Sequence, residues 1–356
     1  MQHELYRANG LPVLQNLTFA TAEQAQASGV ADIVLVQDSQ SGLIFNQTFD
    51  ASKLSYDVDY QNEQAHSVHF QEHLKAVELI LARHFSHRAL LEIGCGKGYF
   101  LEMLRDLGYA ITGIDPSYEG DNADVIRAPF TRELGLSADA IVLRHVLEHI
   151  QDPVAFLAEM AAANQGGHIY IEVPCFDWIL EHKAWFDLFY EHVNYFRLDD
   201  LRRMFGTVLE AGHLFGGQYL YIVADLSTLR LTPEQPVSRL TLPEGFTASL
   251  DRALQIIRSA PEQGSAIWGA SSKGVIYALF LQRAGVAVDR VVDINPAKQG
   301  RYLPLSGARV SSPQEAMDAL PEGANLFVMN SNYLEEIKRM TGGRYVYHAV
   351  DSASFQ

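Results

Sequence analysis

Short apolar runs alternate with segments of helical periodicity through the middle of the chain. The runs predict strands at Ala89–Ile93, Ala110–Ile114, Ala138–Leu143 and His168–Val173, and helices at Tyr99–Leu107 and Pro153–Met160. Strands separated by helices of this length are typical of parallel βαβ units in a doubly wound sheet. The run Gly217–Ala224 is expected as a late edge strand of the same sheet.

Two further units flank this core. Before it, the apolar runs Ala31–Val36 and Gly42–Phe45 resemble a hairpin, and Ser67–Phe85 predicts a helix. After the proline-containing passage Leu231–Gly245 the alternation restarts, with strands at Ser265–Gly269, Val288–Val292 and Ala324–Met329 and a helix at Val275–Leu281. We therefore expect an N-terminal module over residues 1–66, an α/β core over 67–230 and a Rossmann-like C-terminal unit over 231–356.

The composition agrees with a globular protein of more than one domain. The chain has 356 residues, 48% hydrophobic and 20% charged. Its formal net charge of -16 argues against nucleic acid as the main partner, because binding to phosphates needs clustered lysine and arginine. There is no apolar run long enough for a membrane span and no apolar signal core, so we expect a cytoplasmic protein without membrane contact.

Three closely spaced glycines follow the first core strand, in Leu91-Glu-Ile-Gly-Cys-Gly-Lys-Gly98. Glycine lets the backbone approach a ligand and adopt a positive φ. In an open α/β sheet, ligands lie beyond the carboxyl ends of the strands. The spacing G-x-G-x-G, preceded by the acidic Glu92, suits a ligand with a cationic amino acid tail better than a pyrophosphate. We therefore expect S-adenosylmethionine at this turn.

Asp115, at the tip of the next strand, supports this prediction. A carboxylate there can accept both hydroxyls of a ribose, although an Asp before Pro116 also caps turns without any ligand. Phe130 would lie near the adenine or belong to the ordinary core, and Arg144 and His145 would lie beside the methionine moiety. The expected cofactor-binding residues are Glu92, Gly94, Cys95, Gly96, Gly98, Asp115, Pro116, Phe130, Arg144 and His145.

The sequence resembles the three-domain sugar C-methyltransferases of deoxysugar biosynthesis. The segments that carry the resemblance are Leu91–Gly98, Val146–Ile150, Phe189–His192 with Phe196, Ile267–Gly274 and Val292–Gln299. Many methyltransferases share the first of them, whereas the two C-terminal segments are far more specific. The resemblance implies an α/β fold, in which a class I methyltransferase core stands between a small N-terminal module and a second, Rossmann-like α/β domain.

The family's N-terminal module holds zinc on two Cys-x-x-Cys pairs. The corresponding positions here appear as Tyr6–Asn9 and Gln37–Gln40, and the two cysteines of the chain, Cys95 and Cys175, lie elsewhere. A Cys₄ zinc site therefore cannot form. We expect a module that keeps its shape through its hairpin and binds no metal.

The resemblance also implies a reaction. Family members remove a proton beside the carbonyl of a nucleotide-linked keto-sugar, and the enolate attacks the methyl group. His192 matches the family's Glu-His pair as the base, after Glu191. The resemblance also implies His149 as a hydrogen-bonding partner of the substrate and Tyr60 as the residue that closes over the site. Phe189 stands where the family has a tyrosine. Either Tyr190 replaces that phenol, or the acceptor is not a ketone.

In the C-terminal unit, Gly269 and Gly274 enclose Ser271, Ser272 and Lys273 at a strand-to-helix turn. Amides, hydroxyls and a lysine at such a turn form a plausible phosphate cradle. Asp293 ends the next strand and would match ribose recognition. With Lys298, these residues are expected to bind the nucleotide of the acceptor, although the unit could instead only support the core, with Lys298 a solvated charge.

Three other functions stay open on the sequence alone. An enzyme with the same donor site could methylate oxygen or nitrogen of another small metabolite. The C-terminal unit could bind NAD or another nucleotide in a protein that is no methyltransferase, although its turn lacks the middle glycine of the dinucleotide fingerprint. A pseudo-enzyme is disfavoured by the intact glycine turn and Asp115.

Overall fold

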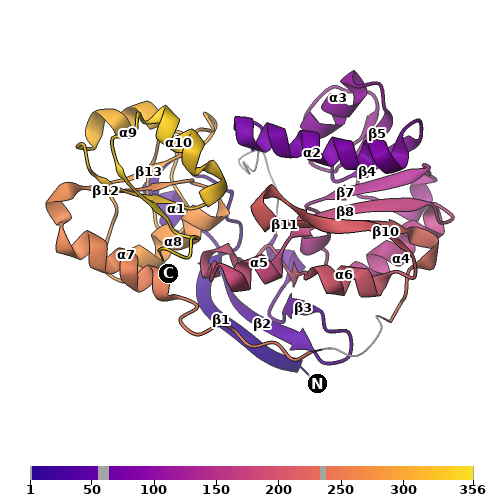
Figure 1. Cartoon of the computed structure of the whole chain (residues 1–356), viewed down its shortest axis with the longest axis horizontal. Coiled ribbons are helices and arrows are strands. Elements are labelled where there is room, and N and C mark those ends of the chain that lie inside the picture. The colour runs from indigo at the N-terminus through magenta and orange to yellow at the C-terminus, as the bar shows by residue number, and fades with distance from the viewer. Residues whose placement is uncertain (1, 55–63, 233–237, 356) are drawn as a thin grey trace.

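The computed structural model describes residues 2–54, 64–232 and 238–355, which form three sheets. Figure 1 shows the seven-stranded and the five-stranded sheet side by side, with the long N-terminal strands beneath them. None of the helices that the structure describes is long and apolar enough to cross a membrane.

The N-terminal sheet has the order β1-β2-β3-β9 and is antiparallel throughout. Its strands are β1 (Gln2–Pro12), β2 (Val30–Asp38), β3 (Ile44–Asn46) and β9 (Asn194–Tyr195). The hairpin β2–β3 was predicted, but β1 was not, because most of its side chains are at least partly exposed and apolar alternation is weak. A short helix, α1 (Ala22–Gln26), connects β1 and β2, and β9 comes from the middle of the chain.

The central sheet has the order β10-β11-β8-β7-β4-β5-β6. The strands are β4 (Ala89–Ile93), β5 (Ala110–Ile114), β6 (Val125–Ile126), β7 (Ala140–Arg144), β8 (His168–Pro174), β10 (Val208–Leu214) and β11 (Tyr219–Asp225). The five strands from β8 to β6 are parallel. Four of them were predicted, and β6 was not. The expectation that residues 217–224 form an edge strand is wrong. β11 lies inside the sheet, antiparallel to β8, because β10 pairs with its other side.

Helices cover both faces of this sheet. Alternate strand residues divide between two cores: Leu90 and Val142 pack with α2 (Val68–Phe85) and α3 (Tyr99–Asp106) on one face. Leu91, Ile141 and Leu143 pack on the other face, with α4 (Pro153–Ala163) and α6 (Leu198–Met204), while α5 (Phe176–Glu181) follows β8. The parallel strands are thus apolar on both sides, which made them easy to recognise in the sequence.

The C-terminal sheet is parallel throughout and has the order β14-β13-β12-β15-β16. Its strands are β12 (Ser265–Trp268), β13 (Arg290–Val292), β14 (Val310–Ser311), β15 (Asn325–Val328) and β16 (Val346–Ala349). Its helices are α7 (Ala248–Ser259), α8 (Ser272–Arg283), α9 (Pro313–Ala319) and α10 (Leu334–Met340). The Rossmann-like pattern was predicted, and the short outer strands were not.

The three parts are tied together by specific contacts. Phe19 forms a β-bridge with Tyr302, so residues after β1 lie against the C-terminal unit. Ser67, which caps α2, donates to Glu336 of α10 at 2.7 Å. β9 joins the N-terminal sheet although it lies within the core in sequence, between β8 and β10. The domain limits at residues 66 and 230 stay a prediction. The first limit does not separate the sheets cleanly, because β9 belongs to the expected core in sequence and to the N-terminal sheet in space.

Candidate active site

The glycine turn begins where β4 ends at Ile93. Gly94 has a φ of 77°, and a Cβ placed on it would lie 2.3 Å from Val146 Cγ2. Its amide donates to the carbonyl of Ile114, the last residue of β5, at 2.8 Å. Only glycine meets both constraints, so the chain turns sharply and brings its amides to the carboxyl edge of the sheet.

Asp115 connects this turn to the neighbouring strand. Its Oδ2 accepts the amide hydrogen of Gly96 at 2.8 Å, and its Oδ1 accepts that of Ser117 at 2.8 Å and the Ser117 hydroxyl at 2.6 Å. The carboxylate therefore does cap its own turn. It also borders a cavity, so its role in the turn is compatible with the predicted role in ligand binding.

Glu92 is buried in β4, and its Oε2 has no hydrogen-bond partner among the residues that the structure describes. Burial raises the pKa of Glu92 to about 7, with Arg144 opposing the rise and Asp115 adding to it. An unpartnered carboxyl oxygen at the cavity wall fits an ammonium group, because such a group would supply the missing donor. The glycine turn, Asp115 and Glu92 together fit S-adenosylmethionine.

Glu172 on β8 is a residue that the sequence analysis missed. It is fully buried, and Tyr170 donates to it at 2.7 Å, while Arg144 and His73 lie at 3.3 and 3.1 Å. Burial opposes its charge, but Arg144 and His73 hold the pKa of Glu172 well below its usual range. The signal in the sequence was a lone acidic residue inside the apolar run His168–Val173.

His145 has a φ of 53° and lies between two carboxylates. Its Nε2 is 3.0 Å from Glu172 and its Nδ1 is 3.4 Å from Glu148. Burial alone would lower the pKa of His145, but the interactions with Glu148 and Glu172 raise it to about 9. The imidazole is therefore charged at neutral pH and acts as a fixed cation rather than as a base.

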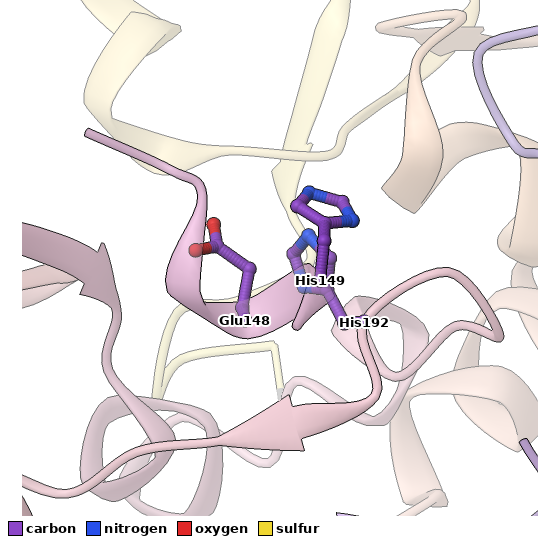
Figure 2. A group of neighbouring side chains, drawn as sticks. All are labelled: Glu148, His149 and His192. Atoms are coloured by element: carbon purple, nitrogen blue, oxygen red, sulfur yellow. The ribbon is translucent and has the colours of Figure 1, made fainter. Parts of the chain in front are cut away.

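His149 and His192 lie side by side, with ring centroids 4.8 Å apart and planes nearly perpendicular (Figure 2). The Nδ1 of His149 lies 2.9 Å from the carbonyl oxygen of Glu191. A carbonyl can only accept, so Nδ1 carries the proton and Nε2 is the acceptor atom of the neutral ring. Burial, with His149 and His145 nearby, holds the pKa of His192 well below its usual range. The ring of His192 thus offers a lone pair at neutral pH.

Glu148 lies beside these rings, and ligand atoms of Glu148, His149 and His192 are within 4.8 Å of one another. Such a group could share a metal ion. Glu148 is, however, also the partner of the charged His145. Our prediction that the enzyme binds no metal therefore stays a prediction.

Two expected catalytic residues point away from the cavity, and a third lies outside the described residues. The hydroxyl of Tyr190 accepts the amide of Asp50 at 2.7 Å, and Glu191 Oε1 accepts that of Gln15 at 3.1 Å. Both side chains are fully buried against the N-terminal part and do not line the cavity, so the geometry disfavours a catalytic role, which stays a prediction. Phe189 faces the cavity instead, 4.1 Å from His192 between ring centroids. Tyr60 falls in the segment 55–63.

The C-terminal turn is as tight as the first one. A Cβ on Gly274 would lie 1.7 Å from the carbonyl oxygen of Gly269. Lys273 Nζ is buried 3.2 Å from Asp187 Oδ2 and 4.5 Å from the ring of Trp178, without a well-aligned hydrogen bond among the described residues. A buried ammonium with unused donors at a helix N-terminus suits an anionic ligand.

Lys298 does not reach the cavity. It is fully buried, and its Nζ donates to Ser271 Oγ at 2.6 Å and to the carbonyl of Ala270 at 3.2 Å. Burial lowers its pKa. The alternative that Lys298 is a solvated charge is wrong, because the side chain is buried and supports the turn from inside. Its direct contact with the substrate is disfavoured by this position and stays a prediction.

One cavity of about 940 Å³ joins these features. All the expected cofactor residues except Gly98 line it, as do His149, His192, Ser271, Ser272, Lys273 and Asp293. Phe130 is at its wall and also packs edge-on against Phe156, so both roles proposed for it are compatible. Residues that the sequence analysis missed include Asn16, Asp187, Tyr219 and Tyr333.

Two family models match the segments of the chain that form the two ends of this cavity. Residues 62–208 match the family described as a methyltransferase domain, and residues 243–347 match the C-methyltransferase C-terminal domain. The first match contains the glycine turn and the histidine pair, and the second contains the turn before α8.

Individual relatives are distant. The C-methyltransferase NovU of Streptomyces niveus is 24% identical over 291 residues, 70% of this chain and 67% of that protein. A ubiquinone biosynthesis O-methyltransferase of Caulobacter vibrioides is 32% identical over 100 residues, which cover 24% of this chain and 40% of that protein. Among solved structures, a 1,6-didemethyltoxoflavin-N1-methyltransferase of Burkholderia thailandensis is 14% identical with a TM-score of 0.33, and the match covers 51% of this chain and 95% of that one.

Proposed function

We propose that this chain methylates a carbon atom of a nucleotide-linked keto-sugar. It is an S-adenosylmethionine-dependent methyltransferase, and it resembles the sugar C-methyltransferases. The observation that carries this proposal is the single cavity of about 940 Å³. It runs from the glycine turn, past the histidine pair, to the turn before α8. A volume of this size is at the upper end for small-molecule sites, so it has room for a donor and a long acceptor together.

The two ends of the cavity suit two different ligands. At one end Asp115 offers a carboxylate to a ribose and Glu92 offers one to an ammonium group, and S-adenosylmethionine carries both of these groups. At the other end, Ser271, Ser272 and Lys273 offer hydroxyls and a buried ammonium to phosphates. We assign the first end to the methyl donor and the second to the nucleotide part of the acceptor.

The acceptor's reactive carbon would then lie between the two ends, beside the histidines. His192 takes the proton from the carbon next to the carbonyl, because its lowered pKa keeps the imidazole neutral. His149, whose ring is fixed by the carbonyl of Glu191, accepts a hydrogen bond from the acceptor. S-adenosylmethionine supplies an electrophilic methyl group on a sulfonium. The carbon–hydrogen bond is broken, a carbon–methyl bond forms, and the electron pair of the sulfur–methyl bond returns to sulfur.

Methylation of oxygen is the second candidate, and Phe189 is the observation that favours it. The ring that faces His192 has no hydroxyl to stabilise an enolate oxygen, and the hydroxyl of Tyr190 is turned towards Asp50. An alcohol acceptor needs only a base. The pair of histidines could serve either reaction.

Donor binding is tested by titration calorimetry with S-adenosylhomocysteine. Asp115→Ala is expected to abolish binding while the fold, followed by circular dichroism, persists. Asp121→Ala, an exposed aspartate nearby, is the matched control and should bind normally. Unchanged affinity in Asp115→Ala would overturn the assignment of the donor site.

The reaction is tested with a panel of nucleotide-linked keto-sugars in D₂O, with S-adenosylhomocysteine in place of the donor. Carbon methylation predicts exchange of the acceptor's carbon-bound hydrogen for deuterium, measured by mass spectrometry. His192→Ala should lose this exchange and keep its donor affinity, whereas His213→Ala, an exposed histidine on β10, should keep both. If the same compounds are methylated when S-adenosylmethionine is supplied but show no exchange, methylation of oxygen would be favoured.

A further inference from the structure

Glu148 is a buried carboxylate without well-aligned hydrogen bonds. It lies in η3 (Leu147–His149), the short turn that follows β7, and is 1% exposed. Neither of its oxygens has a hydrogen-bond partner among the residues that the structure describes. His145 is its cationic neighbour, with Nδ1 3.4 Å from Oε1, but the same ring is shared with Glu172 at 3.0 Å. The carboxylate of Glu148 therefore has capacity for a further positive partner.

Two imidazoles lie beside this carboxylate. The Nδ1 of His149 donates to the carbonyl oxygen of Glu191 at 2.9 Å, so Nε2 is the atom of this ring that would bind an ion. Histidines that bind metals usually donate their other ring nitrogen to a carbonyl or carboxylate in this way. The ring of His192 is 4.8 Å from that of His149 between centroids. One buried carboxylate and two imidazoles thus meet at one place.

The spacing of these groups is close to that of a metal site. One ligand atom from each of Glu148, His149 and His192 lies within 4.8 Å of the others, and Figure 2 shows the three side chains grouped together. Zn²⁺ binds imidazole nitrogen at about 2.0–2.1 Å, so the ligand atoms around one tetrahedral ion are about 3.4 Å apart. Side-chain rotations that move each atom by about 1 Å would bring the group to this spacing.

The two segments that carry the three side chains are held together. Glu148 and His149 are consecutive residues of one turn. The side-chain amide of Asn194 donates to the carbonyl of Ile150 at 2.5 Å, which joins this turn to the segment of His192. A metal site needs ligands on supported backbone. Here the backbone is already in place, and only the side chains would have to move.

We propose that Glu148, His149 and His192 bind one divalent transition-metal ion, for which Zn²⁺ is the simplest candidate. Two imidazoles and one carboxylate are a ligand set of zinc and iron enzymes, and it leaves a coordination position open. All three residues line the cavity, so the open position would be reached from the cavity. The site is separate from the N-terminal module, whose missing cysteines led us to expect an enzyme without metal.

The bound ion would inhibit the proposed base. A histidine binds a metal through the lone pair that otherwise accepts a proton, so the two compete. With the ion in place, His192 would not take the proton from carbon, and His149 would not accept a hydrogen bond from the acceptor. This consequence rests on the proposed function, whereas the metal site itself does not.

The site is tested with Co²⁺, whose visible spectrum depends on its ligands. The whole protein, treated with a chelator and dialysed, is titrated with Co²⁺ and then with Zn²⁺. One Co²⁺ should bind per chain, and Zn²⁺ should displace it. Glu148→Gln and His149→Ala should weaken binding at least about tenfold, whereas His213→Ala, an exposed histidine on β10, should bind like the wild type. Wild-type affinity in both ligand variants would overturn the proposal, because the ion would then lie elsewhere.

X-ray absorption at the zinc edge tests the same site without any variant, so it decides even if the variants do not fold. The spectrum of the wild-type protein with one Zn²⁺ should show two imidazoles and no sulfur. A sulfur ligand, or fewer than two imidazoles, would overturn the proposal.

The effect on the reaction is measured by the deuterium exchange described above, in the presence of S-adenosylhomocysteine. Saturating Zn²⁺ should slow the exchange at least about 100-fold, as for the loss of a general base, and a chelator should restore it. Equal rates with and without bound Zn²⁺ would overturn the inhibition and leave the metal site standing. Absence of exchange in the metal-free protein would contradict the proposed function, and the spectra would still decide the metal site.

Discussion

Glu92 and Glu172 are both buried and both near Arg144, yet their pKa values move in opposite directions. Glu172 is surrounded by Arg144, His73 and His145, which together outweigh the penalty of burial. Glu92 has only the attraction of Arg144 and meets the repulsion of Asp115, so burial dominates. A buried charge is tolerated only with partners. The missing partner of Glu92 therefore supports the proposal that a cationic group of the ligand binds there.

This difference predicts a pH-dependent effect of Glu92→Gln. Because the pKa of Glu92 in the folded protein is about 7, above its ordinary value, the stability linked to its proton is present below about pH 4.5 and is lost as the pH rises through 7. Without ligand, the free energy of unfolding of the variant should therefore exceed that of the wild type by about 3 kcal/mol at pH 8. Near pH 5 the two proteins should differ little. Denaturant titrations at both pH values measure this.

The same variant should bind S-adenosylhomocysteine more weakly, because the carboxylate that would meet the ammonium group is gone. Glu181→Gln, at an exposed position, serves as the control and should change neither property. A stability difference of equal size at pH 5 and pH 8 would show that Glu92 is not the group that titrates.

Single residues were the hardest to predict. Fixed spacings after apolar strands led to the residues expected at the cofactor, all of which except Gly98 line the cavity. The two histidines, Tyr190 and Glu191 were instead assigned to the site through the family resemblance. Neighbouring residues of an irregular segment point in different directions, and only the packing against Gln15 and Asp50 decides which ones face the cavity.

At the scale of elements, the buried parallel strands were predicted almost to the residue, whereas the strands at the edges were missed. β4 and β5 are apolar on both faces, which gives a strong signal. β10 is half-exposed, and β9 is only two residues long, so neither has a pattern of its own. The position of β11 inside the sheet depends on β10 and could not be predicted without it.

The turn between β12 and α8 predicts the effect of one added methyl group. Gly274→Ala places a Cβ 1.7 Å from the carbonyl oxygen of Gly269, so the helix must move. The free energy of unfolding should fall by about 3 kcal/mol, as for severe overpacking, and nucleotide binding should weaken. Thermal unfolding and calorimetry measure the two effects.

Gly29→Ala is the control, because its Cβ would make an ordinary contact of 3.4 Å with Val13. Binding of S-adenosylhomocysteine should persist in both variants, since the donor turn belongs to the other sheet. A Gly274→Ala protein as stable as the wild type would mean that the turn is looser than its geometry indicates.

At the scale of the whole molecule, the site depends on contacts between parts that are distant in sequence. Asn16 donates to Ser272 and accepts from Lys298, so the N-terminal part supports the phosphate cradle. Tyr333 donates to Gln64 at 3.1 Å, which connects the C-terminal unit to the segment before α2. The cavity is therefore a product of the assembled chain rather than of one domain.

Tyr190→Phe tests whether this residue has a catalytic or an assembling role. The hydroxyl binds the amide of Asp50, so its removal should lower the free energy of unfolding by about 1–2 kcal/mol and leave turnover within about twofold. Tyr109→Phe, which loses one bond to Glu78 far from the cavity, should cost a similar amount. A large loss of turnover at an unchanged free energy of unfolding would indicate that Tyr190 acts in the active site.

The residues that follow His192 are hydrogen-bonded to the N-terminal sheet. Val193 accepts the amide of Asn46 at 2.8 Å, and Asn194 pairs with Phe45 where β9 extends the sheet. Even without metal-binding cysteines, the N-terminal module would thus help to position His192, the proposed base. Chimeras between relatives should accordingly exchange this module and residues 189–196 as one piece, because a junction between them would separate the base from its support.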